Sequence, residues 1–340
     1  MAEIEWTEDV LGSPFQQLTL PLAPDEEGEV VATLVRLLPE GRSWWRTALG
    51  RDHAALDDVD VLYVHGWSDY FFQTRLARFW TARGARFHAL DLRKYGRSLR
   101  DGQSPGYVSD LAIYDEDIKH ALSAMGWSAT DGHPNRRLVL FGHSTGGLTL
   151  SLWAARHPGI ASAVVLNSPW LTLQLHAIGR AAVAPILHLS ARLAPLDPGP
   201  QLDLGYYTRA QAEVADPEDP MPEINLAWRP QQTMPVRAGW LQAVAAGQTT
   251  VQSGLGIPVP IQVLLSQRSV IPTRWSEELT RADSVLVVDD IAKAALHLGP
   301  TVTLDRIDGA LHDVFLSRHE ARNDAYARLG RFADTLARSR

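Results

Sequence analysis

Residues 137–150 read Arg-Leu-Val-Leu-Phe-Gly-His-Ser-Thr-Gly-Gly-Leu-Thr-Leu. An apolar run, a Gly-His-Ser-Thr-Gly pentapeptide and a second apolar stretch, in this order, predict a buried strand, a sharp turn and a helix. Ser144 lies at the turn, so its hydroxyl is expected to project over the end of the strand as a nucleophile. Side chains at Gly142 and Gly146 would collide with neighbouring backbone in such a turn. The alternative is that Ser144 or Thr145 only caps the helix.

Short apolar runs bounded by turn residues recur on both sides of this segment. Residues 15–22 and 29–38 alternate apolar and polar side chains around a Pro-Asp-Glu-Glu-Gly turn, which predicts an antiparallel pair at a sheet edge. Later runs are more uniformly apolar, as strands buried on both faces are, and helical stretches separate them. This alternation predicts a doubly wound, mostly parallel α/β sheet. The predicted parallel strands are 59–64, 86–90, 138–141, 163–166, 261–265 and 302–306, and the helical stretches include 72–83, 111–125 and 146–156.

The alternation stops after the sixth predicted strand. Two helical stretches, near 171–193 and 225–246, flank a segment rich in proline and aspartate at 195–222. We interpret residues 170–257 as a helical cap, or lid, inserted into a core formed by residues 1–169 and 258–340. An insertion at this point is expected to cover the carboxyl ends of the strands, where open α/β sheets bind ligands.

Composition restricts the possible functions. The 340 residues are 45% hydrophobic and 21% charged, with a net charge of −7. We find no run rich in Lys or Arg, so nucleic acid is not an expected partner. The absence of cysteine excludes disulfides, a thiol nucleophile and cysteine-ligated zinc. No apolar run approaches the ~20 residues that span a bilayer, and the acidic N-terminus does not resemble a signal peptide. We therefore expect a cytoplasmic protein without a transmembrane segment.

A second loop is expected to face Ser144. The predicted strand 59–64 ends in His65-Gly66 and precedes a helical stretch. The backbone N–H groups of Trp67 and Thr145 would then form an oxyanion hole, two fixed donors directed at the charge that develops in acyl transfer. Only backbone is needed for this role, which leaves the side chain of Trp67 free to line the pocket. The alternative is a simple strand-to-helix turn with a buried histidine.

Taken together, four motifs mark a resemblance to a known family. They are His65-Gly66, Asp-Leu-Arg-Lys-Tyr-Gly-Arg-Ser at 91–98, the pentapeptide at 142–146, and Gly-Ala-Leu-His-Asp at 309–313. The chain resembles the monoacylglycerol lipase/lysophospholipase branch of the α/β hydrolases, which are S33-type serine hydrolases. The resemblance covers most of the chain and is weakest at 170–257. It implies an α/β-hydrolase fold, a Ser-His-Asp triad, no cofactor, and hydrolysis of carboxylic esters that are often lipophilic. We interpret 91–98 as structural.

His312 is the expected general base. It follows the last apolar strand and lies in a loop that contains glycine, which matches the chain order of nucleophile, acid and histidine. The other histidines are less suitably placed: His143 lies inside the turn, His65 ends an early strand, His297 is in a helical stretch and His319 is near the final helix.

The acid departs from the family pattern. In the family it lies in a Gly-x-x-Asp turn directly after the strand equivalent to 261–265, but residues 266–275 contain no carboxylate. We assign the acid to Asp283, because the stretch after it resembles the family's Asp-x-Val-Val segment, and we interpret 266–282 as an insertion. Asp289 and Asp290 are alternatives, although either could begin the helix predicted at 291–298. Asp313 is adjacent to His312, so the required geometry is difficult, and a local backbone contact is expected.

The predicted function is a serine hydrolase that cleaves carboxylic esters, with a small-molecule ester as its partner and no cofactor or metal. An S33-type peptidase or amidase is an alternative, although such peptidases usually carry His-Gly-Gly-Pro-Gly where this chain has His-Gly-Trp-Ser-Asp at 65–69. An epoxide hydrolase or dehalogenase would need Asp at position 144. The displaced acid favours a third class, a non-catalytic binding protein on the same scaffold. The oligomeric state is left open.

The predicted cap is rich in apolar residues, which are expected to pack it onto the core or to form an acyl pocket. They are Trp170, Leu171, Leu175, Ile178, Val183, Ile186, Leu187, Trp228 and Trp240.

Overall fold

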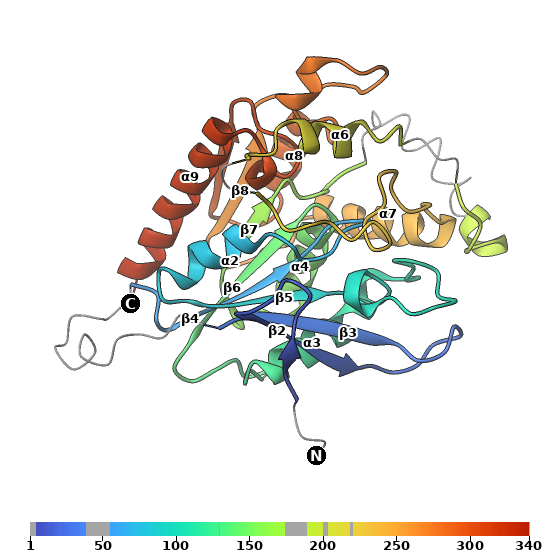
Figure 1. The fold of residues 1–340 in the computed structure, drawn as a ribbon. Helices are drawn as coiled ribbons and strands as arrows, with labels where there is room; N and C mark the ends of the chain where they lie inside the picture. The colour runs from blue at the N-terminus through green and yellow to red at the C-terminus, as the bar shows by residue number, and fades with distance from the viewer. Residues whose placement is uncertain are drawn as a thin grey trace.

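A nine-stranded sheet forms the centre of the molecule (Figure 1). The structure, a computed structural model, describes residues 5–38, 55–128, 130–173, 189–199, 203–217 and 220–339. The strand order is β1-β2-β3-β5-β4-β6-β7-β8-β9. The strands are β1 (Thr7–Glu8), β2 (Phe15–Pro21), β3 (Val31–Leu37), β4 (Val59–Val64), β5 (Arg86–Asp91), β6 (Arg137–His143), β7 (Ala161–Asn167), β8 (Ile261–Ser266) and β9 (Val302–Ile307).

The strand directions confirm the predicted doubly wound, mostly parallel sheet. β4 to β9 are mutually parallel, whereas β3 runs antiparallel to β5 and pairs with β2 at the edge. The short β1 extends this edge beyond the predicted pair. β4 pairs with β5 on one side and with β6 on the other, so the winding direction changes at β4. Ligand sites of open α/β sheets lie at the carboxyl ends of the strands next to such a change.

Helices cover both faces of the sheet, and alternating side chains of the strands pack against them (Figure 1). On β4, Leu62 and Val64 belong to one apolar cluster, while Val61 and Tyr63 belong to the cluster on the opposite face. This is the period of two that strands impose on their side chains. The first cluster includes α3 (Tyr114–Ala124), α4 (Thr145–Arg156), α7 (Ala238–Gln252) and α8 (Val288–Ala295), and the second includes α2 (Thr74–Thr81) and α9 (His319–Arg338).

The connection between β7 and β8 differs in part from its prediction. The helix expected at 225–246 is wrong in its first half, because α7 begins only at Ala238. Pro230 and Pro235 lack the N–H that a helix needs, and their rings would clash with the preceding turn. A short helix, α6 (Tyr206–Glu213), instead lies within the segment at 195–222. Most of the helix expected at 171–193 lies outside the described residues, as do Leu175, Ile178, Val183, Ile186 and Leu187.

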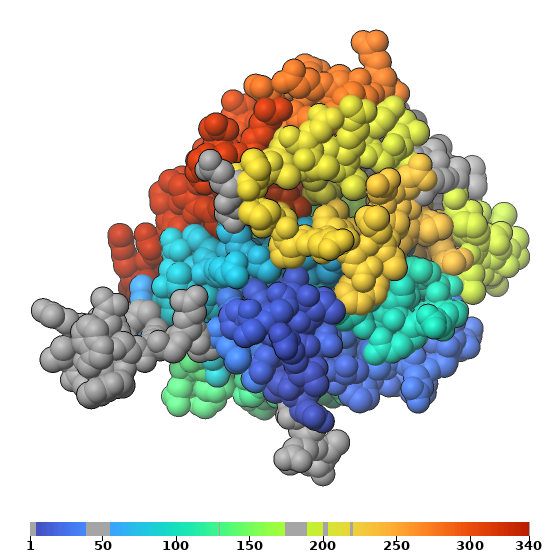
Figure 2. All heavy atoms as spheres, viewed as in Figure 1, coloured from blue at the N-terminus to red at the C-terminus, as the bar shows by residue number. Residues whose placement is uncertain are grey.

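Contacts place the described part of this connection over the loops that follow the strands. The backbone N–H of Asn225 donates to the hydroxyl of Tyr70, which lies six residues after β4 (2.9 Å). The hydroxyl of Tyr207 on α6 accepts from the N–H of Asp313, beyond β9 (3.0 Å). Figure 2 shows a hollow between the yellow segments that carry α6 and residues 225–237. In the described part of the chain, no helix is both long and apolar enough to cross a membrane.

Candidate active site

Ser144 occupies a strained turn between β6 and α4. Its backbone has φ 51° and ψ −118°, a conformation that residues other than glycine rarely adopt. The turn is held from both sides: the Ser144 N–H donates to the carbonyl of Asn167, and the Ser144 carbonyl accepts from Gly147 and Trp170, each at 3.0 Å. A strained backbone conformation persists only where surrounding contacts hold it in place. Such conformations are frequent at functional sites.

The glycines of the pentapeptide are needed for close packing, as the sequence predicts. A Cβ at Gly142 would lie 2.6 Å from the Cα of Gly147. A Cβ at Gly146 would lie 2.3 Å from the carbonyl oxygen of His65 and 2.4 Å from that of Val64. These are backbone atoms that cannot move aside independently. The missing side chains therefore let the start of α4 lie directly against the end of β4.

The two N–H groups predicted to form an oxyanion hole belong to loops that this packing brings together. Gly66 and Thr145 line the same small cavity, together with Trp240 of α7. A Cβ at Gly66 would lie 3.0 Å from the Cβ of Ser144, which shows how closely the loops approach. Among the residues described, no backbone carbonyl accepts from the N–H of Trp67 or Thr145. Trp67 and Thr145 remain the predicted donors of the oxyanion hole.

His65 orients the peptide group that carries one of these donors. The N–H of Leu92 donates to Nε2 of His65 (3.1 Å), so the ring proton is on Nδ1 and donates to the carbonyl of Gly66 (2.7 Å). That carbonyl and the N–H of Trp67 belong to one planar trans peptide and point in opposite directions. The hydrogen bond from His65 therefore directs the Trp67 N–H away from the imidazole. This role agrees with the expectation that His65 is not the base.

His312 and Asp283 form a buried pair. Nδ1 of His312 lies 2.9 Å from Oδ2 of Asp283, and their side chains are 4% and 0% exposed. Oδ1 of Asp283 accepts from the N–H groups of Val285 (2.7 Å) and Leu286 (2.8 Å), which fixes the carboxylate. The imidazole of His312 lies 5.0 Å, between ring centroids, from that of His143, the residue before Ser144.

A local excursion of the chain explains why Asp283 comes so late in the sequence. β8 ends at Ser266, and residues 267–282 leave the sheet and return. The returning chain pairs with the outgoing one, because the N–H of Asp283 donates to the carbonyl of Arg268 (3.0 Å) and the N–H of Val270 to that of Asp283 (2.9 Å). Asp283 therefore lies beside Ser269, three positions beyond β8, where the family pattern would place its acid.

The alternative carboxylates make other contacts. Asp289 and Asp290 lie in the first turn of α8. Asp289 pairs with Arg306 at 2.6 Å, and its side chain is 68% exposed. Asp290 lies 4.0 Å from the amine of Lys293. Asp313 accepts from the N–H of Phe315 (3.0 Å), the local contact that the sequence predicts, and is buried.

Asn167, which was not predicted as a site residue, joins the turn of Ser144 to the loop of His312. Its side-chain amide donates to Oδ1 of Asp313 (2.7 Å), and its side-chain oxygen accepts from the N–H of Val314 (3.2 Å). Its backbone carbonyl accepts from Ser144 and lies 3.1 Å from Nδ1 of His143. A polar residue at the carboxyl end of a largely apolar strand, here β7, is the signal in the sequence that could have identified it. Burial lowers the pKa of His143, and the charge of Asp313 acts in the opposite direction.

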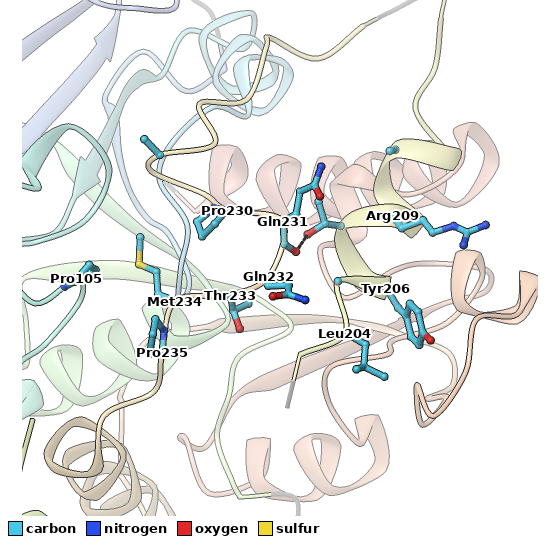
Figure 3. A pocket seen from close by; sticks show the side chains of 14 residues that line it. Pro105, Leu204, Tyr206, Arg209, Pro230, Gln231, Gln232, Thr233, Met234 and Pro235 are labelled. Carbon is cyan, nitrogen blue, oxygen red and sulfur yellow. Dashed lines mark hydrogen bonds between the residues drawn. The ribbon is translucent and has the colours of Figure 1, made fainter. Parts of the chain in front are cut away.

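A pocket of about 1000 Å³ lies within the connection between β7 and β8 (Figure 3). Residues of α6 and the turn before it form one wall, and residues 227–235 form another. Figure 3 shows Tyr206 and Leu204 across the pocket from Met234 and Pro235. The backbone of Met234 also accepts a hydrogen bond from the indole N–H of Trp67 (3.3 Å), so this wall contacts the loop that follows β4.

The doubly wound sheet, the serine turn and the histidine–aspartate pair define an α/β-hydrolase. Residues 58–317 match the family model Hydrolase_4, described as serine aminopeptidase, S33, and the chain belongs to this family. The serine turn and the histidine–aspartate pair therefore occur in the fold and family that the sequence predicts.

Similar proteins include monoacylglycerol lipases. A monoacylglycerol lipase from Mycolicibacterium smegmatis is 27% identical over 261 residues, which cover 75% of this chain and 81% of that protein. The structure of a soluble variant of monoglyceride lipase from Saccharomyces cerevisiae, in complex with a substrate analogue, has a TM-score of 0.61 and 17% identity, covering 93% of this chain and 95% of that one. Monoacylglycerol lipase from Paleococcus ferrophilus has a TM-score of 0.58 and 16% identity, covering 81% and 94%. At these identities the structural likeness shows the fold alone.

Proposed function

We propose that this protein hydrolyses carboxylic esters through a Ser144-His312-Asp283 triad. The observation that carries the proposal is the buried hydrogen bond between His312 and Asp283, formed next to the strained turn of Ser144. An acid that orients a histidine through Nδ1 leaves Nε2 for the nucleophile, which is the arrangement of serine hydrolases. The 27% identity to a monoacylglycerol lipase supports an ester as the substrate class.

The reaction proceeds through an acyl-enzyme. Ser144 attacks the ester carbonyl while His312 takes its proton, and the N–H groups of Trp67 and Thr145 stabilise the oxyanion. His312 then protonates the leaving alcohol. Water, activated by the same histidine, releases the acid and restores Ser144. Asp283 orients His312 and stabilises its cation throughout.

The substrate is proposed to be lipophilic, and residues 170–257 are proposed to act as a cap on the core. The pocket between α6 and residues 227–235 supports this assignment, since Leu204, Ala227, Pro230 and Met234 are among its lining residues. Within residues 170–257, Trp240 and Leu171 are buried, and Trp240 packs against Trp67 with 3.7 Å between ring centroids. Trp240 also lines the small cavity of Gly66 and Thr145, whereas neither Ser144 nor His312 is among the residues that line the larger pocket.

A labelling experiment tests the proposal. We expect a fluorophosphonate probe to label the wild-type protein and turnover of p-nitrophenyl esters to be measurable, with both lost in Ser144→Ala while the circular dichroism spectrum is retained. Absence of labelling in the wild type would indicate a non-catalytic binding protein instead.

Substrate class is tested separately with esters from acetate to laurate and with aminoacyl p-nitroanilides. A kcat/KM that rises with chain length supports a lipophilic acyl group, and hydrolysis of acetate alone would contradict it. Preference for the anilides would favour a peptidase, the activity in the description of the matching family.

A further inference from the structure

The loop that carries the proposed oxyanion donor Trp67 is held by a distant part of the chain. Met234, in the connection between β7 and β8, pairs with this loop through both of its backbone groups. Its carbonyl accepts from the indole N–H of Trp67 (3.3 Å), and its N–H donates to the hydroxyl of Ser68 (3.0 Å). Ser68 has a positive φ of 52°, a conformation that needs such support because it is unfavourable for serine.

The next residue of the loop forms a buried ion pair with the same connection. Nε of Arg229 lies 2.9 Å from Oδ1 of Asp69, and the side chains are 7% and 8% exposed. Arg229 also donates through Nη2 to the side-chain oxygen of Gln211 on α6 (2.7 Å), and its guanidinium lies 5.3 Å from the ring centroid of Phe72. Arg229 therefore connects the loop after β4 to α6 as well as to residues 225–235.

Burial makes stability a poor explanation for this pair. Removing two charges from water costs several kcal/mol, and apolar residues of similar size often stabilise a protein equally well. Removing either partner alone is costly because it leaves an uncompensated buried charge, which favours the geometry that keeps the two side chains together. Asp69 and Arg229 meet as an ion pair and not as a hydrogen bond, since Oδ1 of Asp69 has no hydrogen-bond partner among the described residues. Here that geometry concerns residues 67–69. His65 anchors the carbonyl side of the Gly66–Trp67 peptide, and the contacts at Trp67, Ser68 and Asp69 anchor the side that follows it.

We infer that the Asp69–Arg229 ion pair positions the oxyanion donor, so that Arg229 acts as a positioning residue for the proposed ester hydrolysis without touching the substrate. The inference rests on the proposed function, since it concerns the donor of that reaction. Preorganised donors are effective because they need no reorientation as the negative charge develops. Loss of the pair would let the loop relax from its left-handed turn at Ser68 and misdirect the Trp67 N–H.

The variants Arg229→Gln, Asp69→Asn and their combination test this inference. We expect each single change to lower kcat by about 10- to 100-fold, less than or comparable to the loss of a whole donor, with KM changed by less than about threefold. The affinity of a trifluoromethyl ketone, whose adduct with serine carries an oxyanion, should fall in proportion to kcat. The double variant should be no worse than the more impaired single variant, because the two residues act as one unit. Arg229→Lys should restore part of kcat.

A matched control separates positioning from stability. Arg322 is also a buried arginine paired with an aspartate of the same connection, Asp216 (2.7 Å), but it comes from α9. Arg322→Gln should lower the thermal midpoint without lowering kcat or trifluoromethyl ketone affinity. The inference is overturned if Arg229→Gln retains kcat within about threefold, or if kcat falls while trifluoromethyl ketone affinity does not. The proposed function itself fails only if the wild type shows no turnover dependent on Ser144.

Discussion

Asp283 pairs with His312 although 16 residues separate it from the end of β8 at Ser266. Backbone hydrogen bonds with Arg268 and Val270 hold Asp283 close to the end of β8, although it is distant from that strand in the sequence. Asp289 lies in a helix and pairs with Arg306. The proposed assignment of Asp283 as the acid therefore depends on a loop whose two arms pair with each other.

Replacing the acid tests this assignment. Asp283→Asn should lower kcat by up to about 10⁴-fold, because an amide in place of the carboxylate favours the wrong tautomer of His312. Asp289→Asn should leave kcat within about twofold, since it breaks only an exposed ion pair, and such pairs contribute about 0–1 kcal/mol. Steady-state kinetics with one p-nitrophenyl ester measures both. The reverse result, a defect in Asp289→Asn alone, would show that Asp283 is not the acid.

At the scale of elements, the start of α4 lies against the end of β4. Gly146 sits where the two backbones meet, and its missing side chain decides how closely the serine turn approaches the loop of His65. In an isolated helix, alanine would be about 1 kcal/mol more favourable than glycine. At this position steric overlap with two carbonyl oxygens opposes that preference.

Gly146→Ala tests which effect dominates. The added Cβ would lie 2.3 Å from the carbonyl oxygen of His65, so α4 or the loop must shift. We expect the free energy of unfolding to fall by about 1–3 kcal/mol, as in other overpacked sites. A shift between the proposed oxyanion donors should lower kcat by at least about 100-fold. Ala155→Gly, at a half-buried site of the same helix, serves as the control and should cost about 1 kcal/mol while kcat is retained. A stable and active Gly146→Ala would contradict the packing argument.

At the scale of the whole molecule, both faces of the sheet are covered, and some titratable groups are buried with it. His88 on β5 is 7% exposed, and burial lowers its pKa to about 4, although the charge of Asp60 acts in the opposite direction. Its folded pKa therefore lies below the ordinary value of 6.5. Asp117 behaves differently, because burial raises its pKa to about 6 despite its contact with Arg93.

His88 should make stability depend on pH. Between pH 6.5 and 4 the unfolded chain binds a proton at His88 that the folded protein excludes. The contribution of neutral His88 to the free energy of unfolding is fully present above pH 6.5. It is lost as the pH falls towards 4, and the loss amounts to about 3 kcal/mol. Asp117 acts in the opposite direction over part of this range, so only a difference between proteins isolates His88. Urea unfolding at pH 7 and pH 4.5 should show a smaller loss for His88→Gln than for the wild type. Equal losses would contradict the prediction.

Much of the fold follows from local patterns. The mostly apolar runs predict the central parallel strands to within a few residues, because burial on both faces favours apolar side chains. Within the connection between β7 and β8 the same reasoning misplaces a helix before Ala238 and misses α6. α6 has only eight residues, and its buried contact is Ala210 against Leu311, a residue about 100 positions away. Short helices of this kind depend on tertiary packing more than on propensity.

The sequence alone predicts the turn at Ser144, because a strand, two glycines and a helix in immediate succession are a local signal. It also determined that the sheet is parallel and doubly wound, since strands and helices alternate along the chain. Three contacts follow from the folded chain and not from any local pattern: Asp283 with His312, Asn167 with Asp313, and Arg229 with Asp69. Each of these contacts joins residues 29 to 160 positions apart, and no local pattern encodes which distant side chains the folded chain brings together.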